Sequence, residues 1–159
     1  CKGAAVGGHL GVLRWARANG VPWDSRTCSA AAGQGHFKVL KWARGKGCPW
    51  DKDTCARAAA NGHLGILQWV LNWARSNGCP WDETACTGAA AAGHLDILRW
   101  MRAQKCPWDK NTCSEAARRG HFEVLKWARS NECPWDESTC TSAAAAGRLD
   151  ILQWARAQD

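Results

Sequence analysis

Tyrosine is absent from this 159-residue sequence, and phenylalanine and methionine are scarce, with two and one residues respectively. No apolar run approaches the roughly 18 residues that a membrane helix needs, so we expect no membrane span. Phosphate-binding glycine loops are missing as well, and no Ser–His–Asp or Cys–His arrangement stands apart from the rest of the sequence. These absences predict a protein that is not an enzyme and that needs no cofactor.

The sequence is rich in tryptophan, cysteine and alanine. It contains twelve Trp and ten Cys, and its alanines gather in short runs such as AAAAG. Hydrophobic residues make up 46% of the chain, which is enough for a sizeable core. In one irregular domain these three excesses would need three explanations, whereas a repeated unit accounts for all of them.

Two short motifs recur along the chain at the same spacing. The pair GH begins at residues 8, 35, 62, 93 and 120, and the triplet PWD begins at residues 22, 49, 80, 107 and 134. The step is 27 residues, except for one step of 31. A fixed period of this kind indicates a solenoid, in which each unit buries its apolar face against its neighbours. We expect a single solenoid over residues 1–159, made of a partial repeat at 1–21 and repeats at 22–48, 49–79, 80–106, 107–133 and 134–159.

Each unit is predicted to form two helices. Asp51 can cap the first helix by accepting hydrogen bonds from free backbone N–H groups, and Cys55, Ala58 and Ala59 then share one face. Gly62 can adopt the left-handed conformation that ends this helix. The second helix, HLGILQW, has apolar residues around more than half of its circumference, so we expect it to be mostly buried.

The tryptophans fall into two sets. Those of the PWD triplets are expected to cover the ends of neighbouring helices, and those of the second helices to form an interior ladder. A groove lined by tryptophan is the alternative for both sets. The ladder set is Trp15, Trp42, Trp73, Trp100, Trp127 and Trp154.

The unit TCARAAANGHLGILQWVLNWARSNG resembles the ankyrin repeat, in which an early Thr and an AA pair precede GHL and a leucine-rich second helix. It is most similar to the divergent repeats with the pattern GHLxVLxWARxxGCPWD found in ankyrin-repeat proteins of algae, oomycetes and giant viruses. The resemblance covers all six units and implies an all-α, helix-turn-helix solenoid that binds other proteins. Ankyrin repeats have a period of about 33 residues, so the shorter period implies that the β-hairpin fingers are shortened or absent.

The repeat at 49–79 contains four additional residues, within the segment QWVLNWARSNG. Four residues make about one helical turn, so the second helix can lengthen while its buried face stays nearly in phase. We expect one longer helix here, with a local bulge as the alternative. The added turn is the most distinctive feature of the array and is predicted to contact a partner through Val70, Leu71, Asn72 and Trp73.

The motif GCPWDKDTC, at residues 47–55, looks at first like a metal or redox site. It recurs along the chain, however, and Val21 replaces its first cysteine in one unit. Valine can substitute for a buried thiol but not for a metal ligand or half of a disulfide. We therefore expect free, buried thiols and a reducing intracellular compartment. Disulfides within repeats, and zinc held by residues such as Cys55 and His63, are the alternatives. The GH histidines are expected to bridge helix ends by hydrogen bonds.

An arginine follows each second-helix tryptophan by two residues. Guanidinium groups pair well with carboxylates and stack on indoles, so these arginines and the PWD aspartates are predicted to form a structural ladder of ion pairs. A basic stripe that binds anions is the alternative. The ladder consists of Arg17, Arg44, Arg75, Arg102, Arg129 and Arg156 with Asp24, Asp51, Asp82, Asp109 and Asp136.

The formal charge of +7 is unevenly distributed. Residues 1–78 contain eleven Lys and Arg against three Asp and Glu, whereas residues 79–159 contain ten against eleven. Two functions are compatible with these features. The first is a non-catalytic protein–protein interaction scaffold, or a structural subunit of a larger assembly. The alternative is binding of nucleic acid or another polyanion through the basic N-terminal half. Positions that vary between repeats are predicted to contact the partner, namely Lys38, Lys41, Arg57, Arg99, Arg118 and Arg119.

Neither end of the array has the polar cap that a solenoid needs. Cys1 falls midway through a first helix, and the sequence stops directly after an apolar second helix. We therefore expect that the array continues in a longer chain or that partner subunits cover its ends.

Overall fold

The computed structural model describes residues 1–77 and 81–157, with side chains described for residues 1–72 and 81–157. These residues form twelve helices and no strand, so the predicted all-α fold class is confirmed. No helix in the described ranges has the length and apolar character needed to cross a membrane. The helices are α1 (Lys2–Val6), α2 (Leu10–Ala18), α3 (Ser25–Gly33), α4 (Phe37–Gly45), α5 (Lys52–Ala60), α6 (Leu64–Asn77), α7 (Glu83–Ala91), α8 (Leu95–Ala103), α9 (Lys110–Arg119), α10 (Phe122–Ser130), α11 (Glu137–Ala145) and α12 (Leu149–Arg156).

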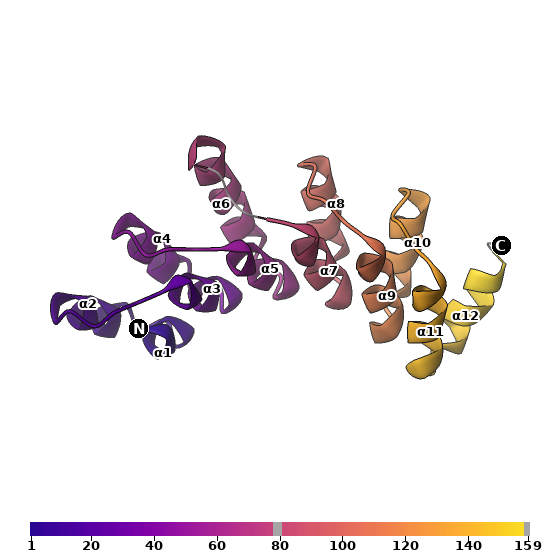
Figure 1. Ribbon diagram of the computed structural model, residues 1–159, viewed down its shortest axis with the longest axis horizontal. Helices are drawn as coiled ribbons and strands as arrows, with labels where there is room; N and C mark the ends of the chain where they lie inside the picture. The colour runs from indigo at the N-terminus through magenta and orange to yellow at the C-terminus, as the bar shows by residue number, and fades with distance from the viewer. Residues whose placement is uncertain (78–80, 158–159) are drawn as a thin grey trace. The chain divides into compact units, whose positions relative to one another are not determined.

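The chain forms two compact units, Cys1–Trp81 and Asp82–Asp159. In the first unit α1, α3 and α5 pack in a row, and α2, α4 and α6 each pack on the helix that precedes them (Figure 1). The second unit repeats this plan, with α7, α9 and α11 in the row and α8, α10 and α12 upon it. Each unit is thus a short solenoid of three helix pairs. A single solenoid over the whole chain stays a prediction.

Local sequence explains where the helices begin and end. At the start of α3 the backbone N–H of Arg26 donates to the carboxylate of Asp24, and the same bond caps α7, α9 and α11. Asp51 makes no such side-chain bond at the start of α5. Gly62 ends α5 with φ of 80°, as predicted, and the glycine of every other GH or GR pair also has a positive φ.

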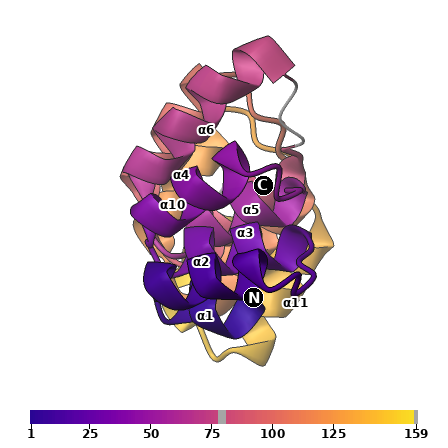
Figure 2. The same cartoon turned by 90° about the vertical axis from the view of Figure 1, so that its left-hand side faces the viewer.

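The helix α6 contains the four-residue insertion and is one continuous helix of 14 residues, whereas its counterparts have eight or nine. Figure 2 shows α6 in the same row as α2 and α4 and extending beyond them. The expectation of one longer helix is therefore confirmed. An insertion of a whole turn keeps the buried face in register, which is why the fold accepts it.

The core lies between the two rows of helices. Cys55, Ala58 and Ala59 of α5 are fully buried on one face, as predicted. In α4, α6, α8 and α10 the buried side chains are those at the positions of Ile97, Leu98 and Met101 of α8. These positions are spaced one and three residues apart and face the alanine-rich first helices, whose small side chains allow close approach.

The second-helix tryptophans do not form an interior ladder, and this expectation is wrong. Trp42, Trp100, Trp127 and Trp154 are half-buried, and Trp15 is exposed. The tryptophan comes three residues after the buried Val or Ile and directly after a polar position. It therefore lies at the border of the buried face, where a large indole can pack along one side only.

Consecutive repeats are joined by their histidines. The Nε2–H of His36 donates to the carbonyl oxygen of Val6 (2.8 Å), and His63 and His121 make the same bond to residues thirty positions earlier. Each ring also sits over the glycine of the preceding repeat, since the point that a Cβ on Gly35 would occupy is 2.7 Å from the ring of His63. The predicted bridging role is confirmed for these three histidines.

Candidate functional site

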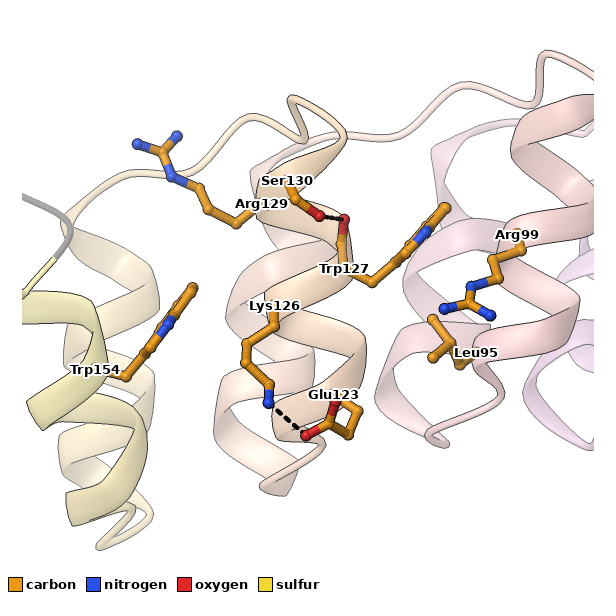
Figure 3. Close-up of a pocket in the computed structure, with 8 residues that line it drawn as sticks. All are labelled: Leu95, Arg99, Glu123, Lys126, Trp127, Arg129, Ser130 and Trp154. Carbon is orange, nitrogen blue, oxygen red and sulfur yellow. Dashed lines mark hydrogen bonds and ion pairs between the residues drawn. The ribbon is translucent and has the colours of Figure 1, made fainter.

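A groove lies between α8, α10 and α12 in the unit Asp82–Asp159 (Figure 3). Its volume is about 620 Å³, and all its lining residues belong to second helices. Trp127 of α10 and Trp154 of α12 project into the space between neighbouring helices (Figure 3). The lining residues are Leu95, Arg99, Glu123, Lys126, Trp127, Arg129, Ser130 and Trp154.

The two indoles of the groove are held from behind by other aromatic rings. Trp127 packs edge-to-face on Trp108, with ring centres 5.8 Å apart. Trp154 packs in the same way on Trp135 (5.8 Å) and on Phe122 (5.6 Å). Such contacts fix the ring orientation and add to the energy of burial. The groove therefore has rigid aromatic walls that leave part of each indole open to a ligand.

The charged groups of the groove differ in how they are engaged. Lys126 forms an ion pair with Glu123, with Nζ and Oε1 2.5 Å apart (Figure 3). The guanidinium carbon of Arg99 lies 5.8 Å from the ring centre of Trp127, and no ion pair to Arg99 is found among the described residues. Arg129 points away from the groove in Figure 3 and lies over Trp135. Arg99 is thus the cation best placed to meet a carboxylate of a partner.

The second-helix arginines contact backbone and tryptophan, whereas a ladder with aspartates was expected. Arg17 donates from Nη1 to the carbonyl oxygen of Val21 (2.6 Å), and Arg44 does the same to Cys48 (2.8 Å). The guanidinium carbon of Arg17 lies 4.4 Å from the ring centre of Trp23, and three further pairs of this kind are 4.2–4.8 Å apart. Arg17, Arg44, Arg102 and Arg129 therefore each tie the end of their second helix to the following PWD turn.

Four of the PWD aspartates, Asp24, Asp82, Asp109 and Asp136, cap first helices. In addition, Asp24 pairs with Arg26 (2.6 Å) and Asp136 with Lys110 (2.7 Å). Among the described residues, no ion pair joins Asp24, Asp109 or Asp136 to a second-helix arginine. Arg156 is exposed, and the side chain of Arg75 lies outside the described residues.

The residues predicted to contact a partner lie on first helices as well as second helices. Arg99 borders the groove, while Lys38 and Lys41 lie exposed on α4, in the other unit. The remaining arginines lie on first helices: Arg57 on α5 and Arg118 and Arg119 on α9, where Arg118 pairs with Glu115. Residues that vary between repeats occur on every exposed surface of a repeat, so variability alone does not identify which face binds a partner.

The added turn of α6 contributes to the core as well as to the surface. Val70 is buried, Leu71 is half-buried and Asn72 is exposed, while the side chain of Trp73 lies outside the described residues. Trp69, and not Trp73, takes the position equivalent to Trp42, with its ring centre 5.9 Å from that of Trp50. A partner contact at this turn stays a prediction, and of the described side chains Leu71 and Asn72 can reach it.

Within a repeat, the two cysteines that come together are twenty residues apart, as are Cys28 and Cys48. Cysteines seven residues apart, such as Cys48 and Cys55, belong to successive repeats. A hydrogen bond with Cys48, together with burial, raises the pKa of the Cys28 thiol, and Cys113 has the same effect on Cys133. Seven of the nine described cysteines are buried, as predicted, and no disulfide joins two of the described cysteines. Among the described residues, no three His, Cys, Asp or Glu side chains are grouped so that they could hold a metal ion.

The fold can be placed among solved structures. The chain is similar to the human ASB11 ankyrin repeat domain, with a TM-score of 0.70 and 15% sequence identity, over 96% of this chain and 80% of that chain. The fold is that of the ankyrin repeat. Its ankyrin-like helix pairs carry no β-hairpin in the described ranges, which agrees with the short period. No family model matches the sequence, and the search of curated proteins gives no match.

The sequence favoured an interior position for Trp127 and Trp154, whereas the structure places both in a groove, which was the alternative. One signal could have found them. In every second helix the residue before the tryptophan is polar, such as Lys126 before Trp127 and Gln153 before Trp154. A large aromatic residue between a polar and an apolar position is typical of a helix edge.

Proposed function

We propose that the protein is a non-catalytic interaction scaffold, or a structural subunit of a larger assembly, that binds a segment of a partner protein in the groove between α8, α10 and α12. The ankyrin-like fold supports protein–protein interaction as the general function. The observation that supports this particular surface is the pair of held indoles, Trp127 and Trp154, beside the cation Arg99.

The chemistry of the groove defines the partner segment. Tryptophan and arginine are the side chains that contribute most often to binding energy at protein interfaces. An apolar side chain of the partner fits against the open parts of the two indoles. An acidic side chain next to it would meet Arg99, whose planar group can bind a carboxylate through two hydrogen bonds. The partner segment is therefore apolar and acidic.

Selection from a library of displayed random peptides tests this proposal. Peptides that bind the purified chain should be enriched in apolar and acidic residues, and Trp154→Ala and Arg99→Glu should each weaken a selected peptide about tenfold or more. Arg119→Glu is the matched control, because it reverses one exposed charge on α9, in the row of first helices, and should leave affinity unchanged. Equal effects of the two charge reversals would show that the groove does not bind.

Binding of a polyanion through the basic N-terminal half is the second candidate. Lys38 and Lys46 are exposed there, and residues 1–78 have an excess of eight positive charges. Retention on heparin that falls steeply with added salt, and that is lost in a Lys38→Glu, Lys46→Glu variant, would favour this function. Retention that does not depend on these lysines would count against it.

A further inference from the structure

The helices α4 and α10 have nearly the same sequence but carry different charges. Both read F-x-V-L-K-W-A-R-x, with Lys38 and Gly45 in α4 where α10 has Glu123 and Ser130. Each is the second helix of the middle pair in its unit. Lys38 and Glu123 are both exposed. The chain therefore carries a cation and a carboxylate at the same exposed position of two equivalent helices.

This exchange changes the state of the lysine that follows three residues later. In α10 the carboxylate of Glu123 pairs with Lys126 (2.5 Å). In α4 the equivalent lysine is Lys41, which is exposed, and no ion pair to Lys38 or Lys41 is found among the described residues. Like charges this close on one helix destabilise it slightly. A bound anion would remove that cost, so the pair of lysines favours an anionic ligand.

The charge difference extends along the row of second helices in each unit. The second residue of the helix is acidic in α8, α10 and α12, whereas the first turn of α2, α4 and α6 contains no acidic residue. These last three helices contain no Asp or Glu at any position. Arg14 of α2 is exposed, as are the two lysines of α4 in the same row (Figure 2). No carboxylate of the row competes with a ligand for these cations.

A groove lies beside Lys38, where α4 and α6 begin. Its volume is about 370 Å³, and the rings of Phe37 and His63 line it. Phe37 packs edge-to-face on Trp69, with ring centres 5.6 Å apart, and Lys41 Nζ lies 5.3 Å from the centre of the Phe37 ring. A held aromatic ring thus lies between two cations. The remaining lining residues are small or aliphatic, namely Gly35, Gly62, Leu64, Gly65 and Ile66.

Aromatic rings interleaved with cations fit single-stranded nucleic acid. Its bases stack on aromatic side chains while Lys and Arg follow the phosphates. The bases of a duplex are stacked on one another, so their faces cannot reach Phe37. A sulfated sugar polymer such as heparin has charge but no base to stack. The combination of Phe37 with Lys38 and Lys41 therefore favours a single strand over either of these anions.

We propose that single-stranded nucleic acid binds at the groove and the two lysines beside it, here called the α4 surface. One base lies in the groove against Phe37, and phosphates meet Lys38 and Lys41. The proposal rests on the second candidate function, binding of a polyanion through the basic N-terminal half, and specifies its surface and its ligand. It does not depend on the groove between α8, α10 and α12.

Fluorescence anisotropy of a labelled oligothymidine tests the proposal. A strand of about 12 nucleotides suits the roughly 4–16 nucleotides that such surfaces cover. The purified 159-residue chain should bind it, with an affinity that falls as salt is added. A duplex of the same length should bind at least about fivefold more weakly, because it offers no base to the groove.

Two substitutions at the α4 surface use residues that other repeats already contain. Lys38→Glu gives α4 the residue of α10 and should weaken binding about tenfold, because the new carboxylate repels phosphate and pairs with Lys41. Phe37→Leu introduces the leucine with which α2, α6, α8 and α12 begin, and should weaken binding of the single strand about fivefold or more. Since other repeats fold with these residues, circular dichroism of both variants should match the parent chain.

Matched variants elsewhere in the chain serve as controls. Phe122→Leu makes the same aromatic change in α10 and should leave binding unchanged. Arg119→Glu makes the same change in charge at an exposed site on α9, in the row of first helices, and should weaken binding far less than Lys38→Glu. Equal losses in the two charge reversals, or in the two Phe→Leu variants, would overturn the assignment to the α4 surface.

Heparin binding separates this inference from the candidate function on which it rests. Heparin retention that depends on Lys38, together with equal affinity for single strand and duplex and no effect of Phe37→Leu, would overturn the inference and leave polyanion binding in place. Absence of binding to both heparin and oligothymidine would overturn both. An acidic peptide that binds in a Lys38-dependent way, while oligothymidine does not bind, would assign the α4 surface to a protein partner instead.

Discussion

Replacing Glu132 with glycine should stabilise the protein. Glu132 follows α10 and has φ of 62°, in the left-handed region, while Gly47 occupies the same place after α4 with φ of 78°. This conformation costs a residue with a side chain about 1–2 kcal/mol. Two backbone hydrogen bonds hold the turn in this conformation. The N–H of Glu132 donates to the carbonyl oxygen of Arg129 (3.1 Å), and the N–H of Cys133 donates to the carbonyl oxygen of Ala128 (3.0 Å).

The expected gain is a difference between two effects. Glycine removes the steric cost of the left-handed conformation but brings about 0.5–1 kcal/mol of additional chain entropy to the unfolded state. The net increase in the free energy of unfolding is therefore about 0.5–1 kcal/mol. Glu132 also places a negative charge beside the negative end of the α10 dipole, so removing it increases the gain.

Urea unfolding followed by circular dichroism measures this change. The midpoint should rise for Glu132→Gly with an unchanged slope. It should fall for Gly47→Glu, which introduces the same strain into an equivalent turn. Lys105→Gly should give a smaller gain, since Lys105 has the same conformation (φ of 63°) but a charge that suits a helix C-terminus. A midpoint that falls for Glu132→Gly would refute the assignment of strain to this turn.

Three further predictions follow from contacts within and between repeats. Gly147→Ala should lower the free energy of unfolding by about 1 kcal/mol, because alanine is strained at its positive φ. Gly35→Ala should lower it by at least about 1 kcal/mol more, because the new methyl group also meets the His63 ring. Chemical denaturation of the two variants measures the difference. Brief alkylation of the native chain should label Cys1 and Cys140 well before the seven buried cysteines, and peptide mass mapping that found Cys28 labelled as fast as Cys140 would contradict the burial. The hydrogen bond from Lys110, followed by that from Ser138, lowers the pKa of Asp136 to about 2 from an ordinary 3.8. Its contribution to stability is therefore complete above about pH 4 and is lost as the pH falls through about 2. An NMR titration should place the Asp136 midpoint near 2 and should move it upward in Lys110→Ala.

The repeat period, the two helices of each unit and the buried Cys–Ala face of α5 could all be predicted from the sequence, because they depend on spacing along one helix. The place of the tryptophans could not be predicted in this way. On α10 the buried positions are held by Val124, Leu125 and Ala128, and Trp127 lies beside them, half-buried. The sequence pattern shows that the tryptophan borders the apolar face, and the packing of the second helices determines whether it is buried.

The arginine contacts show a second limit of the sequence. Arg44 and Asp51 are seven residues apart and carry opposite charges, so an ion pair was a reasonable expectation. A proline and a helix start lie between them, and the structure places the Arg44 guanidinium over Trp50, a contact that charge alone does not predict. The cysteine pairs have the same explanation, since residues seven apart are separated by a turn, while those twenty apart bring a first helix together with the segment that follows the second helix of the same repeat. Contacts across a turn depend on its backbone path, which composition does not encode.

The histidine that caps the glycine of the preceding repeat has a consequence for how such a chain can change in length. The junctions made by His36, His63 and His121 use the same few atoms, namely an imidazole, a glycine without a side chain and a carbonyl group at a helix end. In the last repeat Arg148 takes the place of the histidine, over Gly120 and bonded to the carbonyl oxygen of Arg119. Insertion or deletion of one whole repeat would therefore restore a complete junction on both sides without a change to any other residue. Any other change in length must occur in whole helical turns, as in α6. The number of repeats is thus the property of this protein that can vary with the least disturbance of its internal contacts.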